Sequence, residues 1–272
     1  MIESKQRYID KILEKLPHEI VEPIHSLIND STIDESNPPL TVFDLDWTLL
    51  DGDICESLYL HFLSQGKDLP LSWKKYTEML RAGDHKNAYS EIVLAMAGIT
   101  LDSIYSTCDY LLNHPEDEIE YNIEGETFKF KAPKVNQNMY ALVTVLKLAG
   151  FKVVVVSASP HYAVRYVANN YLGINQDNAF GIKSNLIVDD NYTEYLDSQL
   201  LPPITWNEGK EELLNLNFPN SKIMLTCGDS FGDIPMMNMT DASGLVIIKK
   251  SPESDATMIH DSLPESIRKI VI

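Results

Sequence analysis

Four short apolar runs along the chain have the pattern of buried strands. Each is four residues long and rich in aliphatic or β-branched side chains. Runs of this kind are typical of strands that are covered on both faces of a parallel sheet. The predicted strands are residues 40–43, 153–156, 223–226 and 245–248.

Segments with helical periodicity separate these strands. Apolar residues recur three and four positions apart through residues 139–146 and again through residues 164–171, and Gly150 and Gly173 follow these segments as C-cap signals. The alternation of strands and helices predicts an α/β fold with a Rossmann-like parallel sheet. Ligands of such sheets bind beyond the carboxyl ends of the strands, so we expect the functional side chains there.

Two segments lie outside this alternation. Residues 5–30 carry two amphipathic helical patterns, and a linker rich in turn-forming residues follows them. Residues 55–131 contain four helical patterns and a hairpin signal around Gly125, and they interrupt the alternation after the first strand. The predicted organisation is an N-terminal helical segment and linker (1–37), a Rossmann-like core (38–54 and 132–272) and an inserted α-helical cap domain (55–131).

Composition narrows the class of protein. The 272 residues are 44% hydrophobic and 23% charged, which is typical of a globular protein with a sizeable core. Forty acidic residues against 22 basic ones give a formal net charge of −18, which disfavours binding to nucleic acid or to anionic lipid.

The sequence also bears on location. No apolar run approaches the roughly 18 to 20 residues that span a bilayer, so we expect no integral membrane association. The first residues include an early acid and lack the apolar stretch of a signal peptide. The three cysteines, Cys55, Cys108 and Cys227, are far apart, which suits free thiols better than a disulfide framework. A cytoplasmic location is expected, although secretion by an unconventional route leaves no signal here, and the sequence does not determine the oligomeric state.

Four motifs carry candidate chemistry. Asp44-Leu45-Asp46-Trp47-Thr48 follows the first strand, Ser157 follows the second, Gly209-Lys210 opens a helix, and Gly228 to Asp233 follows the third strand. Each alone has an ordinary explanation as an acidic turn, a helix cap or a solvated lysine. Their order is less ordinary, because three of the four come directly after predicted parallel strands.

In this combination the sequence resembles the haloacid dehalogenase superfamily of phosphatases from about Pro38 onward. The helical insert, the stretch Val156 to Pro160 and the stretch Gly228 to Asp233 resemble the phosphoserine and phosphorylcholine phosphatase branches. The resemblance implies a Rossmann-like core with a helical cap, and a phosphomonoester hydrolase that acts on a small phosphorylated substrate.

Roles for individual residues follow from the chemistry and the resemblance together. Asp44 is the expected nucleophile, which forms an aspartyl phosphate, and Asp46 is the expected proton donor and acceptor. Thr48 and Ser157 are expected to donate hydrogen bonds to phosphoryl oxygens, and Lys210 to balance charge between Asp44 and the phosphate.

A metal ion completes this expected site. By resemblance, Mg²⁺ binds Asp44, the backbone carbonyl of Asp46, and Asp229, while Asp233 orients the waters of the metal. Three of these carboxylates with a phosphate dianion total about −5, whereas Mg²⁺ and Lys210 supply about +3, so the metal is needed to offset repulsion. A site made of carboxylates and water favours a hard ion such as Mg²⁺.

Other functions remain open at this point. A dehalogenase of the same superfamily does not need Asp46, and a phosphomutase is a further alternative. A protein phosphotyrosine phosphatase of the same fold would use the same core residues. Outside enzymes, the chain could be a binding protein without catalytic activity, since a fold does not fix a function.

The cap is expected to choose the substrate. Phosphoserine phosphatases hold the substrate amine with an acid nine positions beyond the nucleophile, which is Asp53 here, but no arginine stands where that branch holds the carboxylate. An amine or choline-like substrate therefore fits better than phosphoserine itself. Asp53 could instead cap the helix that begins near Glu56. Four aromatic residues have two alternative expected roles, which are to face a cationic head group of the substrate or to pack the interior of the cap: Trp47, Tyr59, Trp73 and Tyr76.

Overall fold

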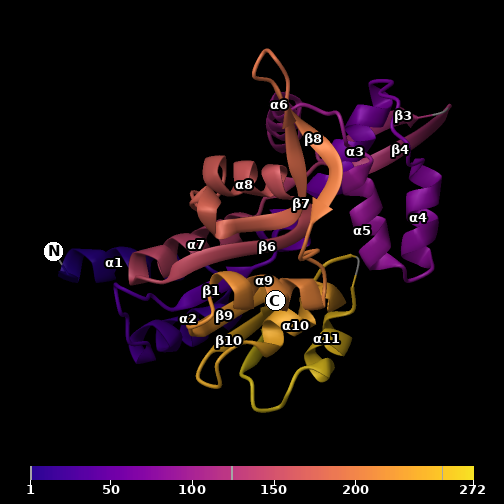
Figure 1. The fold of residues 1–272 in the computed structure, drawn as a ribbon. Coiled ribbons are helices and arrows are strands. Elements are labelled where there is room, and N and C mark those ends of the chain that lie inside the picture. Colours follow the sequence, from indigo (N-terminus) through magenta and orange to yellow (C-terminus); the bar gives the residue numbers. More distant parts are fainter. Residues whose placement is uncertain (1, 124, 253) are drawn as a thin grey trace. The chain divides into compact units, whose positions relative to one another are not determined.

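The computed structural model describes residues 2–123, 125–252 and 254–272. Its largest sheet has seven strands in the order β11-β10-β9-β1-β6-β7-β8 (Figure 1). Neighbouring strands from β6 through β1, β9 and β10 to β11 pair in parallel, whereas β7 and β8 pair antiparallel. The prediction of an α/β fold with a Rossmann-like parallel core is therefore confirmed. The strands are β1 (Leu40–Phe43), β6 (Lys152–Pro160), β7 (Ala179–Val188), β8 (Glu194–Leu201), β9 (Ile223–Gly228), β10 (Leu245–Ile248) and β11 (Lys269–Val271).

Strand register brings the functional motifs to one edge of the sheet. All four residues of β1 are buried, and Phe43 pairs with Val155 on one side and with Cys227 on the other. The N–H of Asp44 continues this ladder by donating to the carbonyl of Cys227 at 2.9 Å. The carboxyl ends of β1 and β9 consequently lie side by side.

The described chain divides into two compact units. The first unit comprises the described residues of Met1–Leu49, Val135–Val156 and Asn207–Ile272, and the second comprises those of Leu50–Lys134 and Ser157–Trp206. Because β6 runs from Lys152 to Pro160, it begins in the first unit and ends in the second. The predicted division into a core and a cap with other boundaries remains a prediction.

Helices of the first unit follow their sequence signals closely. Two N-terminal helices occur as expected, and α7 ends at Gly150, which adopts the left-handed conformation with φ of 101°. Helix α1 packs against α7. The helices of this unit are α1 (Ile2–Leu13), α2 (His18–Asp30), α7 (Gln137–Ala149), α9 (Glu208–Asn217), α10 (Ile234–Asn238) and α11 (Ala256–Ser262).

The second unit is mainly helical. The four helical patterns of the insert form helices, of which α5 begins at His85 with Asp84 as its N-cap residue. The hairpin predicted around Gly125 is formed by β3 and β4. The elements are α3 (Ile54–Ser64), α4 (Trp73–Arg81), α5 (His85–Leu94), α6 (Leu101–Leu112), β3 (Glu118–Ile123), β4 (Glu126–Lys131) and α8 (His161–Asn170).

A long antiparallel hairpin, β7–β8, also belongs to the second unit, and α8 packs beside β7 (Figure 1). No strand was predicted over residues 179–201. Two minor strands, β2 (Leu50–Asp51) and β5 (Lys134–Val135), form a separate two-stranded sheet. The 3₁₀ segments are Gln176–Asn178 and Phe231–Asp233, and the turn Leu45–Leu49 has mixed geometry.

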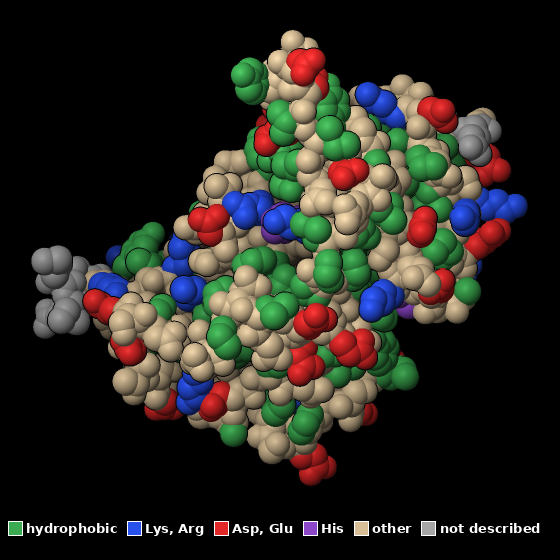
Figure 2. All heavy atoms as spheres, viewed as in Figure 1, with side chains coloured by type: hydrophobic (Ala, Val, Ile, Leu, Met, Phe, Trp, Pro, Cys, Tyr) green, Lys and Arg blue, Asp and Glu red, His purple; other side chains and the backbone are tan. Residues whose placement is uncertain are grey.

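Three further features of the structure concern its surface, its helices and its cysteines. On the face shown in Figure 2, acidic and basic side chains are scattered among hydrophobic and neutral ones. Among the described residues, no helix is both long and apolar enough to cross a membrane. Cys55, Cys108 and Cys227 are all buried and form no disulfide.

Candidate active site

Asp44 occupies the first position after β1 and is 6% exposed. Its backbone N–H is fixed by Cys227, so the side chain leaves the sheet at the carboxyl edge of two parallel strands. One carboxylate oxygen, Oδ1, accepts a hydrogen bond from the ammonium of Lys210 at 2.6 Å. A buried carboxylate with a charged partner thus stands where the sequence places the nucleophile.

Lys210 holds two carboxylates together. It lies in the first turn of α9, and its side chain is only 3% exposed. Its Nζ donates to Oδ1 of Asp44 and to Oδ1 of Asp233, each at 2.6 Å. The ammonium therefore bridges two segments that are 189 positions apart in the sequence, from Asp44 to Asp233.

Both carboxylate oxygens of Asp233 accept hydrogen bonds. Its Oδ2 accepts from the backbone N–H of Asp229 at 3.1 Å, from that of Ser230 at 2.9 Å and from the Ser230 hydroxyl at 3.0 Å. Oδ1 accepts from Lys210. Gly228 makes this arrangement possible, because a Cβ atom there would lie 2.5 Å from Cγ of Asp233.

Asp229 supplies the third carboxylate. It follows β9, is 4% exposed, and its Oδ1 lies 3.4 Å from the hydroxyl of Thr48, which is positioned to donate to it. The Ser254 hydroxyl donates to its backbone carbonyl. Thr48 is fully buried, so the two motifs that follow β1 and β9 meet through these side chains.

Electrostatics in this cluster are strong because water is excluded. Burial raises the pKa of the Asp44 carboxyl well above its ordinary value; the ammonium of Lys210 opposes this effect, and the carboxylates of Asp233, Asp229 and Asp46 reinforce it. Burial alone would lower the pKa of Lys210, but Asp233 and Asp44 outweigh it, so that pKa is raised. Lys210 is accordingly a permanent cation among carboxylates.

The donor set fits a hard divalent cation. Asp44, Asp229 and Asp233 each offer a carboxylate oxygen, and these atoms all lie within 4.8 Å of one another. Three carboxylates and one ammonium leave two negative charges in a buried place, which is costly without a further cation. Oxygen ligands of this kind suit Mg²⁺ or Ca²⁺ rather than a thiolate-seeking metal.

Asp46 and Trp47 shape the turn after Asp44. Asp46 is half-buried, and its carboxylate acts on Asp44 electrostatically. Trp47 has φ of 55° and ψ of −1°, a left-handed conformation that is uncommon for a bulky residue. Its carbonyl accepts from the ammonium of Lys249 at 2.7 Å. Lys249 is not among the residues predicted from the sequence, although it follows the predicted strand 245–248 as directly as Asp44 follows residues 40–43.

Two predicted site residues belong to the second unit. Ser157 is fully buried; its hydroxyl accepts from the N–H of Ser159 at 3.0 Å, and its carbonyl accepts from the hydroxyl of Thr205 at 2.5 Å. Asp53 is the N-cap of α3, where its Oδ1 accepts from the N–H of Glu56 at 2.7 Å. The capping role weighed for Asp53 is thus present.

Three of the aromatic candidates, Tyr59, Tyr76 and Trp73, also belong to the second unit, and they differ in burial. Tyr59 and Tyr76 are fully buried, and their hydroxyls donate to the Leu71 carbonyl and to Glu56, respectively. Both rings therefore contribute to the interior of the second unit. Trp73 is half-buried, with its ring 5.2 Å from that of Tyr76.

The fold and the cluster together define a class of protein: a parallel α/β domain that presents buried carboxylates and a lysine at the ends of its strands. The sequence pattern of haloacid dehalogenase-like hydrolases matches residues 41–238. The chain belongs to this family. No curated protein matches it by sequence.

Solved structures share the fold at low sequence identity. A conserved protein of unknown function from Anaerococcus prevotii DSM 20548 is 18% identical with a TM-score of 0.63, over 93% of this chain and 92% of that one. A phosphoserine phosphatase, solved as an analogue of its phospho-aspartyl intermediate, is 16% identical with a TM-score of 0.53, over 86% and 92%. A HAD family hydrolase from Salmonella enterica serovar Typhi is 15% identical with a TM-score of 0.55, over 94% and 79%.

Proposed function

We propose that this protein is a Mg²⁺-dependent phosphomonoester hydrolase that works through an aspartyl phosphate. One observation carries the proposal: Lys210 bridges Asp44 and Asp233 at 2.6 Å, while Asp229 offers a third carboxylate oxygen within 4.8 Å of the other two. Membership of the haloacid dehalogenase-like hydrolases and structural likeness to a phosphoserine phosphatase support it.

In the first half-reaction, a carboxylate oxygen of Asp44 forms a bond to phosphorus while the bond from phosphorus to the leaving oxygen breaks. Asp46 donates its proton to that oxygen, and the alcohol departs. Lys210 balances the charge that gathers between Asp44 and the phosphoryl group. Thr48 and Ser157 donate hydrogen bonds to phosphoryl oxygens in this scheme.

In the second half-reaction, Asp46 takes a proton from a water molecule, whose oxygen attacks the phosphorus of the aspartyl phosphate. The bond from phosphorus to the Asp44 oxygen breaks, which releases inorganic phosphate and restores the carboxylate. Asp46 ends protonated and ready for the next substrate. One residue thus serves as acid and then as base, which its half-buried position beside Asp44 allows.

Asp44, Asp229 and the backbone carbonyl of Asp46 would hold Mg²⁺, with Asp233 acting through water. The bound ion would supply positive charge that offsets repulsion between the nucleophile and an anionic substrate. A nearby cation also favours the ionised form of Asp44, whose pKa burial otherwise raises.

The proposed substrate is a small phosphorylated metabolite with an amine or choline-like group. Support comes from Asp53, a carboxylate in the second unit that is 9% exposed and uses Oδ1 for the cap of α3. In this proposal, the negative charge of Asp53 attracts the cationic group of the substrate. Tyr59 and Tyr76 take no direct part, because both are fully buried.

The test of the metal-dependent mechanism is hydrolysis of an aryl phosphate with and without chelator. Chelation should stop turnover and added Mg²⁺ should restore it. Ca²⁺ should not, because it takes more ligands at longer distances and disturbs in-line attack. Full activity in excess chelator would reject the proposal.

A second experiment separates the competing functions. A panel of phosphorylcholine, phosphoethanolamine, phosphoserine, a neutral sugar phosphate and a phosphotyrosine peptide is assayed with Mg²⁺. The proposal expects preference for the amine and choline esters. Preference for the peptide would favour a protein phosphatase, and no hydrolysis of any compound would favour a binding protein. Acid quenching during turnover should trap a base-labile phosphoryl group on Asp44.

A further inference from the structure

Lys249 connects three segments of the first unit. It directly follows β10, and its backbone N–H donates to the carbonyl of Gly228 at 2.9 Å. Its half-buried side chain extends to the turn after β1, where the ammonium donates to the carbonyl of Trp47 at 2.7 Å. The residue therefore ties the end of β9 and the turn that follows Asp44 to the end of β10.

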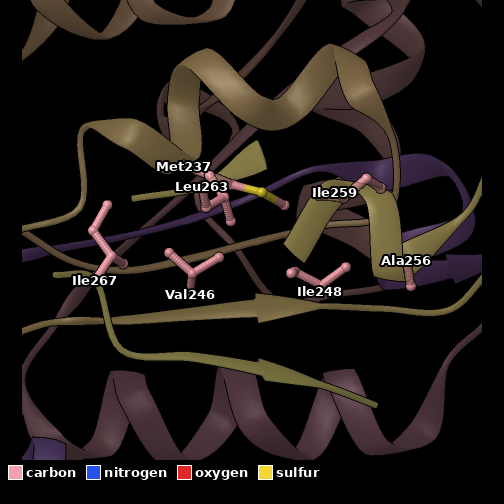
Figure 3. Packing of buried hydrophobic residues seen from close by; sticks show 7 residues of the cluster. All are labelled: Met237, Val246, Ile248, Ala256, Ile259, Leu263 and Ile267. Atoms are coloured by element: carbon pink, nitrogen blue, oxygen red, sulfur yellow. The ribbon is translucent and has the colours of Figure 1, made fainter. Parts of the chain in front are cut away.

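The backbone from which the Lys249 side chain projects lies at the end of a well-packed strand. Ile248 pairs with Gly228 in the parallel ladder of β10 and β9. The side chains of Val246 and Ile248 belong to a buried cluster to which Ile259 and Leu263 also contribute (Figure 3). Because side chains alternate along a strand, Lys249 leaves the opposite face from Ile248. A well-packed strand thus aims the ammonium away from this hydrophobic cluster.

The backbone of Trp47 is the strained part of this turn. With φ of 55° it has a left-handed backbone, which a large side chain adopts only where the surroundings hold it. A hydrogen bond from a charged donor is among the stronger ones available. Since the peptide group is planar, fixing the carbonyl of Trp47 also fixes the N–H of Thr48. The same turn carries Asp46 on its other side.

Lys249 reaches the turn after β1 directly. Its ammonium donates to the backbone carbonyl of Trp47, and that of Lys210 donates to the carboxylates of Asp44 and Asp233. Lys249 also acts electrostatically on Cys227, the residue that pairs with Phe43 at the end of β1. The bond to Trp47 gives Lys249 the geometry of a support for this turn.

We propose that Lys249 is a positioning residue for phosphoryl transfer, which holds the left-handed turn at Trp47 and thereby places Asp46 for proton transfer to the leaving group. The inference rests on the proposed function, in which Asp46 is the general acid. It predicts that loss of Lys249 harms the step that needs a proton more than the attack by Asp44.

Leaving-group dependence provides the readout. An alkyl phosphate needs protonation of its leaving oxygen, whereas p-nitrophenyl phosphate releases a stable phenolate without it. The ratio kcat/KM covers the steps up to departure of the leaving group, so it is independent of the later hydrolysis, in which Asp46 acts as a base for every substrate. In Lys249→Met, kcat/KM for an alkyl phosphate should fall by about 10- to 100-fold, within the range that general acid catalysis supplies. For p-nitrophenyl phosphate kcat/KM should fall by less than about 3-fold, because release of the phenolate does not need Asp46 as an acid. Lys249→Arg, which keeps a charged donor, should recover much of the alkyl phosphate activity.

The neighbouring Lys250 is the matched control. Its side chain is exposed, and Lys250→Met removes the same charge one position along the chain. This variant should hydrolyse both substrates like the parent protein. An equal fall for Lys249→Met and Lys250→Met would mean that net charge matters rather than the bond to Trp47, and it would overturn the proposal.

A measurement without substrate completes the test. Trp47, Trp73 and Trp206 are the three tryptophans of the chain. In a proton–nitrogen NMR spectrum, Lys249→Met should move the indole signal of Trp47 while the other two stay in place, and Trp47→Phe assigns that signal.

The possible failures can be told apart. If the parent protein hydrolyses no phosphate ester, the proposed function fails. If it is active but Lys249→Met lowers kcat/KM equally for alkyl and aryl substrates, with or without a lower melting temperature, Lys249 is only structural and this inference alone is rejected. An unmoved Trp47 signal would reject it as well.

Discussion

The two units of this protein bury titratable groups in opposite ways. The first unit buries charges: Asp44, Lys210 and Asp233 are each at most 6% exposed and are joined by ion pairs of 2.6 Å. The second unit also buries Asp53, at the N-terminus of α3, but two of its buried titratable groups stay neutral. Burial raises the pKa of Tyr76 well above its ordinary value and lowers that of His161 to about 3.

This difference is what we expect if the first unit holds the reactive groups and the buried groups of the second unit are mainly structural. Burial of a neutral phenol or imidazole costs little once its polar atoms are hydrogen-bonded, whereas buried ions remain expensive even when paired. Tyr76 donates to Glu56, and Nδ1 of His161 accepts from the N–H of Gly181, so both are satisfied without charge. The clustered charges of the first unit are explained by chemistry rather than by stability.

The largest effect is expected from removal of the nucleophile. Asp44→Asn should lower turnover by about 10⁴-fold or more, because an amide is a poor nucleophile and a weak metal ligand. The fold should remain, since Asn matches Asp in size. Steady-state kinetics and a melting curve measure both. Normal turnover in the folded variant would remove the assignment of Asp44.

The next effect compares a buried ion pair with an exposed one. Lys210→Met leaves buried carboxylates without their cation and should cost about 3 to 5 kcal/mol in the free energy of unfolding. Arg165→Met breaks the pair with Asp177, whose side chain is 73% exposed, and should cost less than about 1 kcal/mol. Urea unfolding of both variants in chelator makes the comparison. Equal losses would contradict the view that the charges buried in the first unit are the more costly ones.

Asp53 tests whether the second unit takes part in recognition. Asp53→Asn keeps an oxygen that can cap α3 but removes the charge. Hydrolysis of a cationic phosphomonoester should lose about 2 to 5 kcal/mol of transition-state binding, while a neutral aryl phosphate reacts nearly as before. Asp53→Ala, which also removes the cap, should lower the melting temperature. If Asp53→Asn slows both substrates to the same extent, Asp53 only caps the helix.

The smallest effect concerns the neutral histidine of the second unit. Burial, with Lys183 and Arg165, lowers the pKa of His161 from 6.5 to about 3. Below pH 6.5 the unfolded chain therefore binds a proton that the folded chain does not, and stability falls as the pH falls from about 6.5 toward 3. At pH 5 the loss should be about 2 kcal/mol.

His161→Asn provides the control for this pH dependence. The amide oxygen can accept from Gly181 as Nδ1 does, but the side chain does not titrate in this range. Unfolding at pH 7 and at pH 5 should show a loss about 2 kcal/mol smaller in the variant. An identical loss in both proteins would show that His161 is not the group responsible.

The parallel core could be predicted from the sequence because its signals are local. Residues 40–43 and 245–248 coincide with β1 and β10, since a short buried strand leaves a continuous apolar run. The hairpin β7–β8 was not predicted, because the burial of its residues is irregular along both strands and no clean alternation results. Helix boundaries in the insert could be placed only within a few residues.

The candidate site was predictable in its residues but not in its contacts. Asp44 and Asp229 stand out because they follow strands. Nothing in the sequence, however, indicates that Lys210 contacts Asp233 as well as Asp44. The left-handed turn at Trp47 left no signal either, since a bulky residue is not expected there. Contacts between distant segments depend on packing, which periodicity does not record.

Gly228 has a consequence for genetic screens. A side chain there would collide with the Asp233 carboxyl, so the requirement for glycine comes from a neighbouring side chain. Selection for folded protein and selection for activity should therefore disagree about this position. Second-site suppressors of Gly228→Ala selected for solubility should appear at Asp233 as smaller residues, and every one of them should be inactive. The combination of Gly228→Ala with a smaller residue at position 233 would restore the shape of the loop but would lack the Asp233 carboxylate that Lys210 contacts.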